Sequence, residues 1–159
     1  MKTFAYMILM TIVAMIIIQP LMEVAEVCRE QIMISSATSN AFRAARDRSL
    51  MYENQRELDA IASLNDFSDY FAEAFADTLD LSIGTISYGS IEFNSYNDLY
   101  DDFIVEIDLY EETDFGGETI TTAEINVSTN YKFKNKLLKV ITDKYELKQN
   151  RSYLLAVKN

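Results

Sequence analysis

Residues 4–22, FAYMILMTIVAMIIIQPLM, form an apolar run around which the rest of the chain is organised. Thr11, Gln19 and Pro20 interrupt it. As a helix rising about 1.5 Å per residue, the run spans roughly 28 Å, close to the ~30 Å hydrocarbon core of a bilayer. The run therefore predicts a membrane-spanning helix. Its strongly apolar residues, which we expect to face lipid, include Phe4, Ile8, Leu9, Ile12, Val13, Ile16, Ile17 and Ile18.

A cleaved signal peptide or a lipoprotein signal could also produce an apolar run at this place. A signal peptide begins with a positive charge before such a run, but no small-x-small cleavage pattern follows here. A lipoprotein signal at Cys28 needs a small residue just before the cysteine, where this chain has Val27. The residues favour an uncleaved single-pass helix in the cell membrane. Lys2 is the only charge on its short side, which predicts a cytoplasmic N-terminus and an extracellular C-terminal domain.

The helical pattern continues beyond the apolar run, through residues 23–50. We expect Arg43, Arg46 and Arg48 in the last turns, where cations suit the helix dipole. Apolar and small side chains recur at spacings of three, four and seven, which predicts one buried stripe. The predicted stripe is Leu21, Val24, Cys28, Ile32, Ser35, Phe42 and Ala45.

Small residues lie near the end of this helix. Ala37, Ala41 and Ala45 follow each other at intervals of four, so they share one helix face. Small residues at this spacing let a second helix approach closely. That helix could belong to a neighbouring subunit, or the alanines could cover the chain's own sheet.

We expect three parts in the chain: a transmembrane segment at 1–22, an extramembrane continuation of the helix at 23–50, and an extracellular domain at 51–159. In the last part, helical spacing of apolar residues gives way to alternation, which indicates an α+β fold. The predicted fold is a long N-terminal helix, further short helices, and an antiparallel β-meander packed on the long helix. The expected helices are 54–64 and 66–79, the expected strands are 83–88, 90–94, 103–110, 123–133 and 144–157, and 136–141 is either a short helix or a loop.

The net charge is −11, which argues against a nucleic-acid partner. Residues 53–124 are strongly acidic, whereas residues 131–159 are predominantly basic. These segments could simply neighbour each other within one fold. They could also form opposite faces of a subunit that assembles head to tail.

No constellation in the sequence predicts catalysis. There is no His and a single cysteine, Cys28, so no paired nucleophile and base can be identified. Residues 97–102, NDLYDD, could supply oxygen ligands to calcium, although they match no EF-hand loop and also suit a solvated loop. We therefore expect a protein that is not an enzyme, with no metal site and no cofactor.

The helix continues with SSATSNAFRAARDRS at residues 35–49, and the chain given ends with INVSTNYKFKNKLLKVITDKYELKQNRSYLLAVKN at residues 125–159. Both stretches resemble TadE-like proteins, the minor pseudopilins of tight-adherence (Flp) pili. In that family, the membrane helix leads into a run of the type Asn-Ala-x-Arg-x-Ala-Arg. The C-terminal part is similar as well, with an aromatic pair ending one strand, a short connector and a last strand, on Tyr131, Phe133, Tyr153 and Val157. The motif positions in the helix are Asn40, Ala41, Arg43, Ala45 and Arg46.

The resemblance implies a pilin-like fold and a structural function, as a subunit or assembly factor of a surface pilus or secretion filament. The implied partners are membrane lipid, other pilin-like subunits or pilus assembly proteins, and a second copy of the chain. Pilin-like precursors usually carry a Glu early in the membrane helix, whereas the first acidic residue here is Glu23. The alternative function is a membrane-anchored extracellular binding module that does not polymerise.

Overall fold

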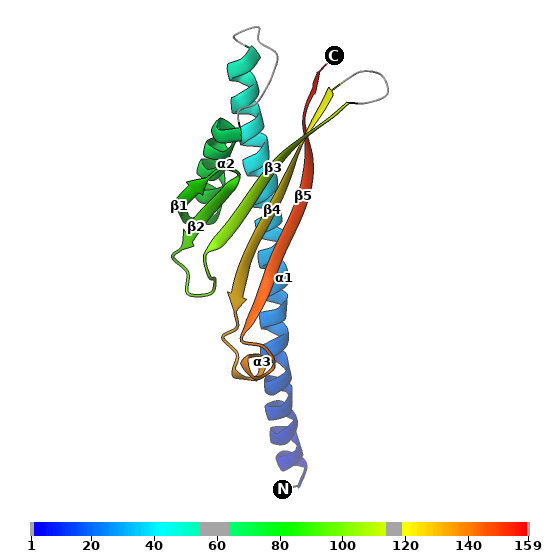
Figure 1. The fold of residues 1–159 in the computed structure, drawn as a ribbon. Coiled ribbons are helices and arrows are strands. Elements are labelled where there is room, and N and C mark those ends of the chain that lie inside the picture. Colours follow the sequence, from blue (N-terminus) through cyan, green and yellow to red (C-terminus); the bar gives the residue numbers. More distant parts are fainter. Residues whose placement is uncertain (1, 55–63, 114–118, 159) are drawn as a thin grey trace.

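The computed structural model describes residues 2–54, 64–113 and 119–158 of the chain. It confirms the predicted α+β class, with a long N-terminal helix and a five-stranded antiparallel sheet packed against it (Figure 1). The elements, in chain order, are α1 (Lys2–Asn54), α2 (Leu64–Leu79), β1 (Leu81–Ser87), β2 (Ser90–Ser95), β3 (Phe103–Thr113), β4 (Thr119–Lys132), α3 (Lys136–Ile141) and β5 (Lys144–Lys158).

Helix α1 is one continuous element of 53 residues. It contains no Gly, and Pro20 does not end it. The helix extends past position 50 to Asn54, so the prediction that Arg43, Arg46 and Arg48 lie in its last turns was wrong. Most of the expected helix at 54–64 lies outside the described residues.

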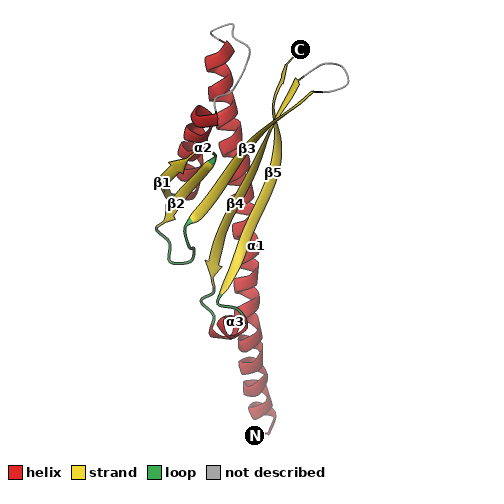
Figure 2. Cartoon of the chain, in the orientation of Figure 1, coloured by secondary structure: helices red, strands yellow, loops and turns green. Residues whose placement is uncertain are grey.

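The sheet is a simple meander in the order β1-β2-β3-β4-β5 (Figure 2). Strand β3 has the predicted alternation, because Phe103, Val105 and Ile107 are buried while the residues between them are exposed. The antiparallel pairing of β3 with β4 agrees with the predicted meander, and residues 114–118 between them are outside the described part. Residues 136–141, which the sequence left ambiguous, form a short helix.

The turn between β1 and β2 depends on Gly89. This residue has φ +75°, a backbone conformation that side chains with a Cβ rarely adopt. Its carbonyl accepts a 2.7 Å hydrogen bond from the Ile107 N–H. A Cβ at this position would lie 2.9 Å from the Ile107 carbonyl oxygen, so the close approach of β3 also requires glycine.

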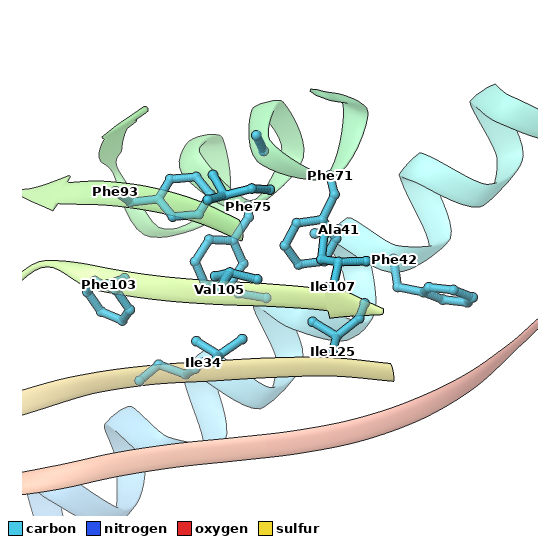
Figure 3. Packing of buried hydrophobic residues seen from close by; sticks show 14 of the residues in the cluster. Ile34, Ala41, Phe42, Phe71, Phe75, Phe93, Phe103, Val105, Ile107 and Ile125 are labelled. Carbon is cyan, nitrogen blue, oxygen red and sulfur yellow. The ribbon is translucent and has the colours of Figure 1, made fainter. Parts of the chain in front are cut away.

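The hydrophobic core lies between the two long helices and one face of the sheet (Figure 3). An aromatic edge of α2 lies at its centre, since Phe67, Phe71 and Phe75 are fully buried. The Phe75 ring lies 5.1 Å from the ring of Phe93 on β2, a distance typical of favourable aromatic pairs. On the other side of the core, Phe42 of α1 stacks on Tyr153 of β5 at 4.3 Å.

Candidate functional site

The N-terminal half of α1 projects away from the domain (Figure 1). Within the described residues, α1 is the one helix that is long and apolar enough to cross a membrane. No residue of its most apolar 18-residue stretch is buried. The predicted membrane-spanning side chains are all exposed to solvent in the chain by itself: Phe4, Ile8, Leu9, Ile12, Val13, Ile16, Ile17 and Ile18. This half of the helix therefore presents apolar surface in every direction and needs an apolar environment.

Glu23 marks the point at which α1 meets the domain. Its side chain is only 7% exposed. One carboxylate oxygen accepts the backbone N–H of Lys134, and the other accepts the N–H of Asn135 at 2.9 Å. Charge-assisted hydrogen bonds of this kind are stronger than neutral ones. The first acidic residue after the apolar run thus fastens the connection between β4 and α3 to the long helix.

The connection leads directly into α3, which has an unusual distribution of side chains. Asn135 caps the helix, because its side-chain oxygen accepts the Leu137 N–H at 2.8 Å. Leu138 is partly buried and packs against the core. None of the residues of α3 is fully buried, and Leu137, Val140 and Ile141 are exposed. We call residues 134–141 the α3 segment.

The C-terminal half of α1 buries only part of the predicted stripe. Phe42 and Ala45 are buried, whereas Leu21, Val24, Cys28 and Ile32 are exposed. The buried residues of this half are Glu23, Val27, Ile34, Ala37, Thr38, Ala41, Phe42, Ala45 and Ser49. The prediction failed near the junction because the buried face there includes an acid and, further along, hydroxyl side chains. Their polar atoms find partners: Thr38 and Ser49, for example, donate to backbone carbonyls one turn earlier.

Ala37, Ala41 and Ala45 are 0% exposed. Figure 3 shows Ala41 among the side chains of Phe71 and Ile107, which come from α2 and β3. Of the two alternatives, the structure therefore supports the one in which the alanines pack inside the chain. In the single chain, α2 and the sheet occupy the space beside these alanines.

The residues of the family-type motif separate onto two sides of α1. Ala41 and Ala45 belong to the core, whereas Asn40 and Arg43 face solvent. Arg46 lies over the ring of Phe42 at 5.9 Å and forms an ion pair with Asp47.

A second arginine contact connects the two long helices. Arg48 forms an ion pair with Glu73 of α2, and its guanidinium lies 5.5 Å from the Tyr70 ring centre.

Four C-terminal positions were named in the resemblance. Tyr131 and Phe133 are buried and in edge-on contact, and Tyr153 stacks on Phe42 of α1. The side chain of Val157 is outside the described part.

The predicted calcium-type loop contains an ion-pair network. The Asp101 carboxylate forms ion pairs with the Lys132 ammonium at 2.8 Å and with the Lys144 ammonium at 2.6 Å. These two lysines hold the pKa of the Asp101 carboxyl well below its usual range. Among the residues described, no group of three or more His, Cys, Asp or Glu side chains is arranged to hold a metal ion. Acidic and basic segments thus meet within one chain, as the first of the two charge hypotheses expected.

A cavity of about 610 Å³ lies between α1 and the loop that joins β2 to β3. Its lining includes Glu30 from α1 and Tyr100 from the loop. Within the described part of the chain, Glu30 Oε2 and the Tyr100 hydroxyl are buried without hydrogen-bond partners. Burial and the nearby Glu30 carboxylate raise the pKa of Tyr100 above its usual value. Polar and apolar side chains both line the cavity, and no nucleophile is paired with a base among its described lining residues.

Comparisons with protein-family models, curated proteins and solved structures gave no match to this chain. The geometry of α1 and its surroundings is therefore the basis for assigning a function. The sequence had indicated the apolar half of α1 but not the role of Glu23 or the α3 segment. A signal was present in both cases, namely an acid directly after the apolar run and a short Lys-rich apolar stretch between two strands.

Proposed function

We propose that this chain is a single-pass, membrane-anchored structural subunit or assembly factor of a surface pilus or secretion filament, similar to TadE-like pseudopilins. In this proposal, residues 4–22 of α1 lie in the bilayer and the α+β domain lies outside the cell. The N-terminus is cytoplasmic, because Lys2 provides the positive flank that stays inside. The protein acts by helix packing and polar contacts between subunits rather than by catalysis.

The observation that carries the proposal is the division of α1 into two halves. One half projects with all of its described side chains from position 3 to position 19 exposed, and the other half is built into the core of the domain. Burying apolar surface is worth about 25 cal/mol per Å², so a projecting apolar helix is strongly favoured to enter lipid or to pack on similar helices. A continuous helix that crosses this boundary couples the anchor rigidly to the domain.

The structure also limits which surface of α1 could join subunits. The alanine face is filled by the chain's own core, so it is not accessible to a neighbour. Above Met22, the outward face carries Val24, Cys28 and Ile32, all of them exposed. We therefore assign contacts between the α1 helices of neighbouring subunits to this outward face and to the apolar half of the helix.

Membrane fractionation, followed by measurement of the mass of the mature chain, tests the anchor. The proposal predicts a membrane-bound product that retains residues 4–22 and resists extraction by alkaline carbonate. A soluble product that begins after Val27 would contradict it.

Cross-linking through Cys28 tests self-association. This cysteine is exposed on the outward face of α1 and is the only one in the chain. A membrane-embedded filament subunit should give dimers and higher species with a short bismaleimide, and none after Cys28→Ser. Ile32→Asp should reduce these products several-fold, whereas the matched change Ser87→Asp, at an exposed polar position on β1 and not on α1, should not.

A membrane-anchored binding module is the second candidate function. The open cavity favours it, because Glu30 and Tyr100 place buried polar side chains in its wall. Anchoring without cross-linked species would support this candidate over the filament subunit.

A further inference from the structure

The α3 segment exposes apolar side chains without any structural need to do so. Val140 is 86% exposed, Ile141 is 80% exposed and Leu137 is 51% exposed. Only Leu138 turns inward and packs against the core. A six-residue helix that connects two strands could fulfil that role with polar residues at the three outward positions. Its outward face is therefore an apolar patch that needs an explanation.

The position of this patch along α1 is fixed by hydrogen bonds. The N–H groups of Lys134 and Asn135, directly before α3, donate to the two carboxylate oxygens of Glu23. Glu23 is the first residue after the apolar run 4–22. Figure 1 shows α3 beside α1, below the sheet and above the projecting half of the helix. The patch thus lies at the level where the apolar run ends.

The charges around the patch have one predominant sign. Lys134, Lys136 and Lys139 are exposed within the α3 segment, which contains no acidic residue. The nearest acid in the chain after the segment is Asp143, which is followed by Lys144, the partner of Asp101. A short helix with apolar side chains between exposed lysines is typical of elements that lie in the interface of an anionic membrane. Lysine stems can extend along apolar surface while their ammonium groups reach phosphate.

We propose that the α3 segment is a second membrane contact, in which Leu137, Val140 and Ile141 enter the boundary between headgroups and acyl chains on the domain side of the bilayer. The lysines bind the phosphates of anionic phospholipids. This inference rests on the proposed anchorage of α1 in a membrane. Two contacts, α1 through the bilayer and α3 on its surface, fix the height and the tilt of the domain above the lipid, because Glu23 connects them.

Depth-dependent fluorescence quenching tests this contact in the full chain. The chain, with Cys28→Ser, is reconstituted into vesicles of phosphatidylethanolamine and phosphatidylglycerol, and an environment-sensitive fluorophore is attached at Val140→Cys. Tyr88→Cys is the matched control, since Tyr88 is 84% exposed and lies in the turn between β1 and β2. Lipids that carry a quencher on the upper acyl chain should quench the label at position 140 several-fold more than the label at position 88.

Charge reversal provides a second arm. Lys136→Glu with Lys139→Glu should reduce quenching at position 140 by at least half in vesicles containing phosphatidylglycerol. Equal and weak quenching at positions 140 and 88, in a chain that floats with the vesicles, would overturn the α3 contact and leave the anchor intact. Failure of the chain to float would overturn the anchor itself. If the fluorescence of the label at position 140 changes with protein concentration and not with quencher lipid, the α3 segment contacts another protein. That result would also overturn the lipid contact.

Discussion

The two halves of α1 are equally helical and differ completely in their surroundings. Residues 4–22, apart from the partly buried Pro20, are exposed on every side, whereas residues 23–49 place one face in a core with α2 and the sheet. The first half is apolar all round, and the second half has a narrow buried stripe in which small residues alternate with larger ones. Hydrophobicity alone therefore does not indicate a core. The half with fewer apolar residues is the one that organises the domain.

The largest expected effect is the loss of membrane retention when charged residues are placed in the apolar half of α1. Ile12→Lys with Ile16→Lys places two charges in the middle of the apolar run, and each costs about 2.5–3.5 kcal/mol on insertion scales. We expect the chain to move from the membrane fraction to the soluble or aggregated fraction. Fractionation in alkaline carbonate measures this. The control replaces residues 4–22 with an unrelated apolar helix of equal length, which should remain anchored. Unchanged membrane retention of the double lysine variant would be incompatible with a spanning helix.

The same substitution should lower domain stability in the second half of α1 and leave it unchanged in the first half. Ala41→Leu forces extra volume into a position that is 0% exposed, and overpacking of this kind costs about 1–3 kcal/mol. Ala14→Leu adds the same atoms to an exposed position in the apolar half and should leave the domain unchanged. Pulse proteolysis in urea, on the detergent-solubilised chain, gives the free energy of unfolding for both. Equal stabilities would mean that the alanine face is not part of the core.

The junction between the halves should be sensitive to Glu23. Glu23→Ala removes the acceptor of two backbone N–H groups, and a buried donor left without a partner costs about 1–3 kcal/mol. We expect amide hydrogen exchange at Lys134 and Asn135 to accelerate together with a loss of stability. The control is Glu26→Ala, at an exposed position one turn away on the same helix. If both variants exchange alike, the carboxylate does not hold the α3 segment.

The smallest expected effect is the pH dependence from Asp101. Its folded-state pKa is lowered by Lys132 and Lys144, so the ion pairs stabilise the fold above the unfolded pKa of about 3.9 and lose this contribution as pH falls through the lower folded value. Because Asp101 is partly exposed, we expect less than about 1 kcal/mol. Urea unfolding of the wild type and of Asp101→Asn should differ at pH 7 and converge towards pH 2. A difference that grows as the solution is acidified would have the wrong sign.

The sequence predicts the domain better than it predicts the junction. Alternation along β3 and β4 and the spacing of Phe67, Phe71 and Phe75 identify elements that the structure confirms, because each buries a single apolar face. The buried face of α1 could not be predicted in this way. Near the junction, apolar residues occur on both sides of α1. Glu23 and Thr38 can be buried because they form hydrogen bonds, and the donors to Glu23 come from a distant part of the chain.

The α3 segment illustrates the same limit. Six residues are too few for a helical period to be recognised, and its helix depends on a cap by Asn135 and on attachment to Glu23. Its position beside the end of the apolar run follows from the way β4 and β5 pack along α1. This packing joins residues far apart in the sequence, so no local sequence pattern predicts it.

Thiol accessibility along α1 tests the division of the helix most directly. Single-cysteine variants Ile12→Cys and Ile16→Cys, in a Cys28→Ser background, are compared with the native Cys28 in permeabilised membranes, so that a polar maleimide reaches both sides. We predict rapid labelling at Cys28 and very slow labelling at positions 12 and 16, because a thiol in hydrocarbon neither ionises nor meets the reagent. Equal labelling rates at all three positions would contradict the division of the helix, since they would place the apolar half of α1 in water.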